Sequence, residues 1–377
     1  MKLQILLPLI FSIISTVNSG AITSEDNIFE QVFADPQMKP LRNIFEYGWL
    51  ILNQLEFCLF PKEQTWNYSY FHQFLRQYGL NQENLDDALD TVKLQEKPLV
   101  KFQEPRIPRK THRVWITHSL NPTECHDSVK NPQLFEEILN TNRVLDQSAS
   151  INSGKWEHYL WTNDKSAIPK TVKWFEQNGI KVRELRELPS YDLIFDRMIE
   201  EYSVGKFAAA ADVARMIIMN DEGGLYLDID SYFASFDDDW LYYFDSIFWK
   251  DRLRFDSLVL FNYQFLSKPN HPVSQEYLKL FKISYTNPEH LKKCYIKTKG
   301  ITLWETGPFI FTIAFILGAQ KNGNRDFVMF PQNTNEDQVY SFYDTKSQPI
   351  DLKFHGYSIG LGSWIDDYAD TLIFGFE

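Results

Sequence analysis

The sequence predicts an α/β fold in which a mostly parallel sheet is flanked by helices. A strand at 156–162, a helix at 169–178 and a strand at 180–188 follow one another with short connections, an order that requires parallel strands. A helix at 207–222 then leads through two glycines into another short strand. The composition, 44% hydrophobic and 23% charged over 377 residues, is sufficient for one large domain with an extra lobe, or for two domains.

Other elements are expected along the chain. Pro105, Pro108 and neighbouring basic residues mark a boundary, and residues 111–117 then alternate like a first strand. Helices are expected at 191–202, 273–281 and 309–317, and a strand at 257–261. The three acids at 237–239 are expected to form a solvated turn, because adjacent side chains point in different directions.

The N-terminal part is expected to lie apart from the sheet. Residues 1–20 resemble a signal peptide, with Lys2 at the start and an apolar run from Leu3 to Val17. That run is short and interrupted for a bilayer span of ~20 residues, and an uncleaved signal anchor is the alternative. Only in that case would a membrane be a partner. Residues 21–104 show helical patterns and no recognisable chemistry.

The net charge of −12 argues against a nucleic-acid partner. Surfaces that bind nucleic acids need clustered basic residues, and no basic run of sufficient length occurs. An acidic protein that binds a phosphate-bearing ligand would need a cation between the two.

The most informative stretch is 207–233. Alanines at 208–211 favour a helix, and Asp212 and Arg215 lie three residues apart on it, away from its apolar positions. Gly223 and Gly224 end the helix. In the strand expected at 225–230, a period of two places the side chains of Tyr226, Asp228 and Asp230 on one face.

Two carboxylates on one strand face repel unless a positive charge lies between them. Asp228 and Asp230 therefore suggest a divalent cation such as Mn²⁺ or Mg²⁺, which proteins usually hold through one or two carboxylates together with substrate phosphates. An Asp-x-Asp pair alone fits a solvated strand end or turn equally well.

The whole string is more specific than the acidic pair. Ala-Asp-x-x-Arg at 211–215, followed by Gly-Gly-x-Tyr-x-Asp-x-Asp at 223–230, resembles the DXD-containing sugar-binding region of nucleotide-sugar glycosyltransferases. That family includes the yeast Golgi α-1,6-mannosyltransferase, α-1,4-N-acetylglucosaminyl- and galactosyltransferases, capsule-synthesis enzymes and, distantly, the large clostridial glucosylating toxins. Weaker family matches occur at Ile107, Pro108, His112, Trp115 and Ile116, at the Thr-Gly-Pro of 306–308, and at His355 with Gly-Ser-Trp at 362–364.

The resemblance implies a GT-A-like, Rossmann-type catalytic domain over 105–377. Asp230 would be a metal ligand, and Asp228 would be shared between the metal, the ribose and the donor sugar. Asp212 would accept hydrogen bonds from sugar hydroxyls, and Arg215 would donate to the sugar or the diphosphate. These four are the candidate catalytic residues, although a surface ion pair between Asp212 and Arg215 is an alternative.

The resemblance also implies further donor contacts. Trp115 and Ile116 would lie at the nucleotide base, with a core tryptophan as the alternative for Trp115. Glycine at 307 would let the backbone approach the donor. The C-terminal tail would fold over the donor, where His355 or Ser363 would approach the metal and the indole N–H of Trp364 would bond the leaving phosphate. Of these, His355 is the expected metal ligand, and Ser363 and Trp364 are expected donor contacts. Two positions depart from the family pattern: Ala211, where some toxin relatives carry Ser, and Asn163, where Asp is expected.

The predicted function is a metal-dependent glycosyltransferase that moves a hexose or N-acetylhexosamine from a UDP- or GDP-sugar to a glycan or protein acceptor, with retention of configuration. The expected location is the secretory pathway, either secreted or associated with the Golgi or the cell envelope. One alternative is a non-catalytic sugar- or nucleotide-binding protein on the same fold. Another is a toxin-like effector that glycosylates host proteins.

Overall fold

The computed structural model describes residues 98–118, 120–128, 132–250, 260–286, 302, 305–329 and 337–358. The predicted signal segment, nearly all of the region 21–104, and the tail residues Ser363 and Trp364 lie outside these ranges. Among the described residues, no helix has both the length and the apolar character that crossing a membrane requires.

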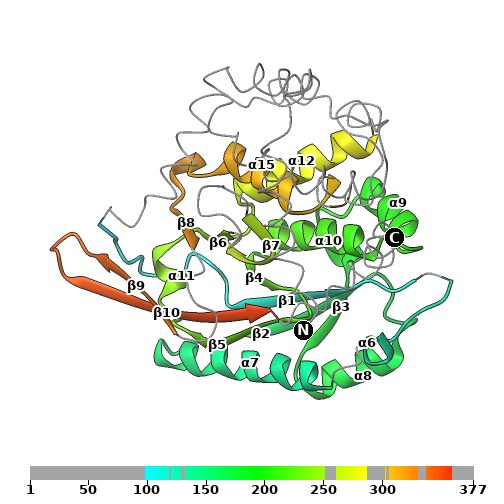
Figure 1. Cartoon of the computed structure of the whole chain (residues 1–377), viewed down its shortest axis with the longest axis horizontal. Helices are drawn as coiled ribbons and strands as arrows, with labels where there is room; N and C mark the ends of the chain where they lie inside the picture. The colour runs from blue at the N-terminus through cyan, green and yellow to red at the C-terminus, as the bar shows by residue number, and fades with distance from the viewer. Residues whose placement is uncertain are drawn as a thin grey trace, which may run out of the picture.

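A seven-stranded sheet forms the centre of the structure, with strand order β3-β2-β1-β4-β7-β6-β8 (Figure 1). Four neighbouring pairs are parallel, and β7 is the strand that runs against the others. This confirms the predicted α/β fold with a mostly parallel sheet. The bounds are β1 Lys110–Trp115, β2 Glu157–Thr162, β3 Lys181–Glu184, β4 Gly224–Leu227, β6 Ser246–Lys250, β7 Leu260–Ser267 and β8 Asp326–Met329.

Helices cover both faces of this sheet (Figure 1). On one face lie α10, α12 and α15, of which α12 and α15 pack closely against each other. On the other face lie α7 and α8. The bounds are α6 Cys125–Ser128, α7 Gln133–Ile151, α8 Pro169–Gln177, α9 Leu193–Tyr202, α10 Phe207–Asp221, α11 Trp240–Tyr243, α12 Pro272–Thr286 and α15 Pro308–Gly318. The β2-α8-β3 unit and the helices near 191, 207, 273 and 309 agree with the sequence, whereas α7 was not anticipated.

A second, three-stranded sheet adjoins the first, in the order β5-β10-β9. Its strands are β5 Ser231–Phe236, β9 Gln338–Tyr343 and β10 Pro349–Ser358, and all pair antiparallel. The β9-β10 hairpin extends away from the main sheet, while β5 packs on α7 (Figure 1). The chain therefore passes from one sheet to the other between β4 and β5, at residues 228–230.

Two predicted elements are wrong in detail. The strand expected at 225–230 ends at Leu227. The amide of Asp228 still donates to the Tyr263 carbonyl of β7, and the chain then turns. The turn closes where the Ser231 amide donates to the Asp228 carbonyl, 3.0 Å away. The two acids therefore lie on a turn between sheets and not on a strand face.

The acidic triplet at 237–239 forms a turn, but its central residue is not solvated. The Asp238 side chain is 1% exposed and accepts two hydrogen bonds from Arg109, of 2.8 and 2.6 Å. Its neighbour Asp239 pairs at the surface with Lys101. Because Arg109 lies 129 residues away in the chain, no local pattern pointed to this pair.

Candidate functional site

The α10 helix supplies two of the predicted site residues, Asp212 and Arg215. Both are buried, at 7% and 4% exposure, which excludes the alternative of a surface ion pair. The helix is followed by Gly223 and Gly224, with φ of 60° and 102°, and β4 then brings the chain back beside it. A residue with a side chain would be strained in this left-handed region, so the two glycines set the connection that carries Asp228 to Arg215.

Arg215 lies between two carboxylates. Its Nη2 is 3.1 Å from Oδ1 of Asp212 and 3.1 Å from Oδ1 of Asp228. Its Nη1 donates to the Asn262 carbonyl at 2.6 Å, and its guanidinium lies 4.7 Å from the ring centre of Tyr226. One buried cation thus joins an acid on a helix to an acid on the turn after β4.

Asp212 is held by three donors from separate segments. Besides Arg215, the Asn262 amide donates to Oδ1 at 2.8 Å and the Thr306 hydroxyl donates to Oδ2 at 2.9 Å. Burial raises the pKa of Asp212 to about 7, against the opposing effect of Arg215. A carboxylate has about four acceptor positions, so one position on Oδ2 is left for a further donor.

Thr306 also places the predicted Gly307. It precedes Gly307, which is the N-cap of α15, and its carbonyl accepts from the Tyr277 hydroxyl at 2.5 Å. The Thr-Gly-Pro triplet therefore contacts Asp212 through the hydroxyl of its threonine. The sequence had suggested a role for the glycine and none for the threonine. Asn262, the other partner of Asp212, belongs to no motif in the sequence and was not predicted as a site residue.

Asp228 is fixed through one oxygen and open at the other. Its Oδ1 accepts from the Tyr226 hydroxyl at 2.7 Å in addition to Arg215, and no hydrogen bond among the described residues uses Oδ2. The side chain is 30% exposed. Burial raises the pKa of Asp228, Arg215 opposes this, and the nearby charge of Asp230 raises it further. The arrangement holds the carboxylate while leaving one oxygen for a ligand.

The acids at 228 and 230 suit a hard divalent cation. Both are only partly buried, on a turn at the end of β4, and their charges are close enough to interact. Two carboxylates with remaining positions open to phosphate oxygens are a common arrangement for Mg²⁺ or Mn²⁺. The described residues contain no group of three metal-ligating side chains.

His355 does not join this pair of acids. It lies in β10 and pairs with Ser235 of β5, which is four residues along β5 from Ser231. Its Nδ1 is 3.6 Å from Asp337. At the usual rise per residue, this is roughly 13 Å along the strand from Ser231. The histidine predicted as a third ligand is therefore separated from the turn.

The predicted base-binding residues lie at the same edge of the sheet as the acids. Trp115 is the last residue of β1, which pairs in parallel with β4, so the carboxyl ends of the two strands adjoin. Its indole N–H donates to the Thr123 carbonyl at 2.9 Å, and the ring is partly buried. Ile116 is buried. Ligands of open α/β sheets bind at such an edge.

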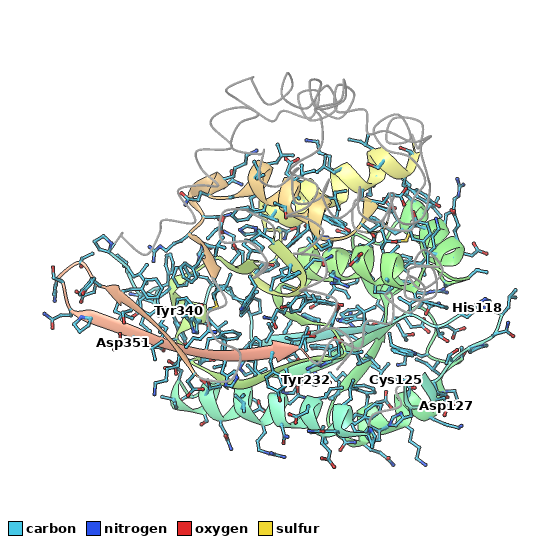
Figure 2. The ribbon with its side chains drawn as sticks, in the orientation of Figure 1. His118, Cys125, Asp127, Tyr232, Tyr340 and Asp351 are labelled. Carbon is cyan, nitrogen blue, oxygen red and sulfur yellow. The ribbon has the colours of Figure 1, made fainter. Side chains whose placement is uncertain are left out.

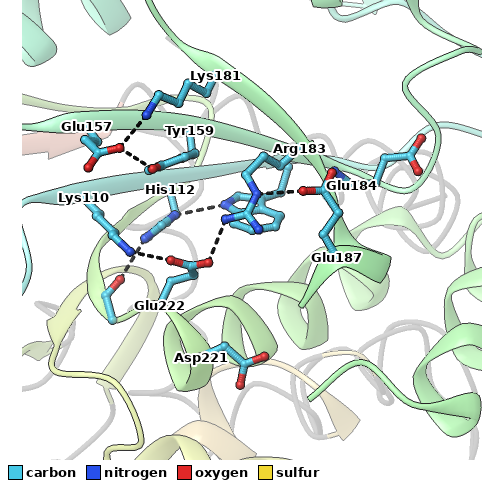
Figure 3. Close-up of polar contacts among 12 residues, drawn as sticks. Lys110, His112, Glu157, Tyr159, Lys181, Arg183, Glu184, Glu187, Asp221 and Glu222 are labelled. Atoms are coloured by element: carbon cyan, nitrogen blue, oxygen red, sulfur yellow. Dashed lines mark hydrogen bonds and ion pairs between the residues drawn. The ribbon is translucent and has the colours of Figure 1, made fainter. Parts of the chain in front are cut away.

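Another matched residue, His112, lies three positions before Trp115 in β1 and is drawn in Figure 3. Its Nε2 is 2.8 Å from the Gly223 carbonyl, and its Nδ1 is 3.0 Å from the indole nitrogen of Trp161. Burial lowers the pKa of His112 to about 3, so the ring is neutral. Beside it, Glu222 pairs with Lys110 and Arg183. These contacts hold Glu222 and Gly223, which form the turn between α10 and β4, and thereby fix the two elements that carry the site residues.

Comparison with known families gives one match, in the central part of the chain. Residues 136–245 match the family model described as a glycosyltransferase sugar-binding region containing a DXD motif. The match includes Asp212, Arg215, Asp228 and Asp230 and ends before Asn262 and Thr306. A comparison with curated proteins gives no match.

Several solved glycosyltransferase structures are similar at low identity. The PaToxG glycosyltransferase is 15% identical, with a TM-score of 0.42, over 64% of this chain and 79% of that one. The UDP-bound glycosyltransferase domain of the YGT toxin is 11% identical, with a TM-score of 0.38, over 59% and 79%. The bacterial N-acetylglucosamine transferase NleB is 10% identical, with a TM-score of 0.30, over 56% and 97%.

At these TM-scores the similarity to solved structures carries no argument, and the resemblance depends on the family match alone. The predicted resemblance is confirmed: residues 136–245 of this chain match the model of a glycosyltransferase sugar-binding region containing a DXD motif.

Proposed function

We propose that this protein is a metal-dependent glycosyltransferase that moves a hexose or N-acetylhexosamine from a nucleoside diphosphate sugar to a glycan or protein acceptor. The observation that carries the proposal is the Asp212–Arg215–Asp228 arrangement, in which Nη2 of one buried guanidinium lies 3.1 Å from each acid. It holds Asp228 with one oxygen open, next to Asp230, at the edge of the sheet where ligands bind.

The reaction breaks the bond between the anomeric carbon and the diphosphate oxygen, so negative charge grows on the leaving group. A cation held by Asp228 and Asp230 would stabilise that charge electrostatically. The charge of Arg215 favours the ionised form of Asp228. Arg215 also orients this carboxylate, because it pairs with the same oxygen that Tyr226 bonds. Asp212 has one acceptor position left, which suits a sugar hydroxyl. The chain's own residues thus orient the donor around a fixed pair of acids.

Retention of configuration and a location in the secretory pathway belong to the same proposal. The anomeric configuration of the product, followed by NMR from the first turnovers, tests retention directly. Expression of the full chain with a C-terminal tag in eukaryotic cells tests location, and secretion or Golgi staining is the expected result. Purely cytosolic protein would contradict the location and would leave the chemistry unaffected.

The deciding experiment measures sugar release from a panel of UDP- and GDP-sugars by the full chain, with Mn²⁺ or with EDTA. One donor is expected to be hydrolysed in Mn²⁺ and not in EDTA, and Asp230→Ala is expected to lose this activity. The control is Asp351→Ala, which removes an exposed carboxylate from the far part of the β10 hairpin (Figure 2). It should keep wild-type activity.

The negative result is equally informative. If a nucleotide binds with Mn²⁺ in calorimetry but no donor is hydrolysed, the transferase proposal fails and a non-catalytic binding protein replaces it. If no nucleotide binds either, the proposed donor site fails as well. If a nucleotide binds equally well in Mn²⁺ and EDTA and release persists in EDTA, the enzyme stands and its metal dependence fails.

A further inference from the structure

Arg113 is buried beneath the turn that carries Asp228 and Asp230. It belongs to β1 and is 2% exposed. Its Nη1 donates to the Asp228 carbonyl at 2.5 Å and to the Ser231 carbonyl at 3.0 Å. One nitrogen therefore ties down the first and last residues of the turn, whose own closing bond runs from the Ser231 amide to the Asp228 carbonyl.

The turn is held from both faces of the sheet. His112 and Arg113 are consecutive in β1, so their side chains point to opposite faces. Tyr226 and Arg215 hold the Asp228 carboxylate on the side of α10. Arg113 holds the main chain from the other side, where its guanidinium lies 5.9 Å from the ring of Tyr232. Tyr232 is labelled close to the start of β5 in Figure 2.

Burying the charged guanidinium of Arg113 costs free energy, which its contacts must offset. Its Nη2 is buried without a hydrogen-bond partner among the described residues. Burial lowers the pKa of Arg113 to about 10, so the group is still charged at neutral pH. An apolar side chain would fill the same place without an unsatisfied donor. The contacts with the turn explain why an arginine is found there.

We propose that Arg113 is a positioning residue for the cation site, and that it acts by fixing the backbone of residues 228–231. The inference depends on the proposed function, since it assigns the cation to Asp228 and Asp230. The hydrogen bonds that Arg113 donates within the described part of the chain go to main-chain carbonyls of the turn and not to its two carboxylates. Groups that orient metal ligands in this way commonly change metal affinity or activity by about 10- to 100-fold when removed.

A purely electrostatic role for Arg113 makes the opposite prediction. The charge of Arg113 interacts with both acids and lowers the pKa of Asp228, against the larger, opposite effect of burial. If Arg113 mattered only as a charge, removing it would make the site more negative and would tighten Mn²⁺ binding. If it positions the turn, removing it loosens Mn²⁺ binding. The sign of the change separates the two roles.

The test compares Arg113→Met and Arg113→Lys with wild type in two measurements. Mn²⁺ binding is followed by electron paramagnetic resonance in the presence of UDP or GDP. We expect about 10- to 100-fold weaker binding for the methionine variant and partial recovery for the lysine variant. Hydrogen exchange of peptides covering 225–233 should be faster in the methionine variant by about tenfold, and nearly normal in β2.

The matched control is Arg109→Met, which changes a partly buried arginine four residues before Arg113. It loses the ion pair with Asp238 and does not touch the turn. Its global stability should fall, while Mn²⁺ binding by the folded protein and exchange at 225–233 should stay at wild-type values. This control separates general destabilisation from loosening of the turn.

Tighter or unchanged Mn²⁺ binding in Arg113→Met, or unchanged exchange at 225–233, would overturn the inference. The exchange measurement also keeps the two proposals distinct. If wild type binds no Mn²⁺, the metal-dependent function fails and the assignment of Arg113 to a cation site fails with it. If wild type binds Mn²⁺ and only the Arg113 result is negative, the function stands and this inference alone is wrong.

Discussion

The indole N–H of Trp161 donates to Nδ1 of His112 across 3.0 Å. Because Nδ1 is an acceptor, the ring proton lies on Nε2, which donates to the Gly223 carbonyl at 2.8 Å. A residue of β2 thus sets the tautomer of a histidine in β1, and the histidine in turn holds the turn between α10 and β4. The bond from Trp161 needs the neutral ring, since a protonated imidazole has no acceptor, whereas the Nε2 bond to Gly223 can form in either state.

The first prediction concerns stability in acid. The pKa of His112 is about 3 when folded, below its ordinary value of 6.5, because burial disfavours the charged ring. The unfolded chain therefore binds this proton first, so the stabilisation is complete above pH 6.5 and is lost as pH falls toward 3. The contribution changes by about 1.4 kcal/mol per pH unit. Urea unfolding at pH 7, 6 and 5 should show that the free energy of unfolding falls less steeply with pH in His112→Gln than in wild type. Parallel slopes would contradict this account.

A second prediction concerns the glycine that begins β4. Gly224 has φ of 102°, and a Cβ there would lie 2.4 Å from the Lys110 carbonyl oxygen. Gly224→Ala is expected to lower the free energy of unfolding by at least about 2 kcal/mol, from strain and the clash together. Gly179→Ala is the control, since Gly179 also has positive φ, of 77°, but has no atom within 4 Å of the added carbon. It should lose about 1 kcal/mol. Equal losses would show that the close approach is unimportant.

A third prediction tests the hydroxyl that links α15 to Asp212. Thr306→Val removes the donor to Oδ2 of a buried carboxylate at nearly constant volume. We expect a stability loss of about 1–3 kcal/mol, and reduced donor turnover if Asp212 contacts the sugar. Thr306→Ser keeps the hydroxyl and should stay near wild type in both assays. If valine and serine behave alike, the hydroxyl does not hold Asp212.

A fourth prediction compares two neighbouring ion pairs. Arg109→Met leaves Asp238, whose side chain is 1% exposed, without its cation, and should cost about 3 kcal/mol or more. Lys101→Met breaks the pair with Asp239, where both partners are over a third exposed, and should cost less than about 1 kcal/mol. Thermal unfolding of the two variants side by side measures the difference. A larger loss of stability for Lys101→Met than for Arg109→Met would contradict the burial of Asp238 and the exposure of Asp239.

The sequence by itself determined the local elements. The apolar spacing, the alanine run and the glycine pair at 223–224 predicted α10 and its end, and the order of strand, helix and strand predicted β2, α8 and β3. The motif at 211–230 also predicted that Asp212, Arg215 and the two later acids belong to one family pattern, and the family match at 136–245 includes all four. Such features depend on residues a few positions apart, so periodicity reveals them.

Only the tertiary structure decided how the site is held. Asn262 and Thr306 lie 50 and 94 residues from Asp212, and Arg113 lies 115 residues from Asp228, yet all three make direct hydrogen bonds there. The same holds for His355, which strand pairing places beside Ser235 and away from the acids. Contacts of this kind arise when the sheet and helices pack, and no periodic pattern in the chain encodes them. The residues of the pattern were therefore predictable, whereas the residues that support it became visible only in the fold.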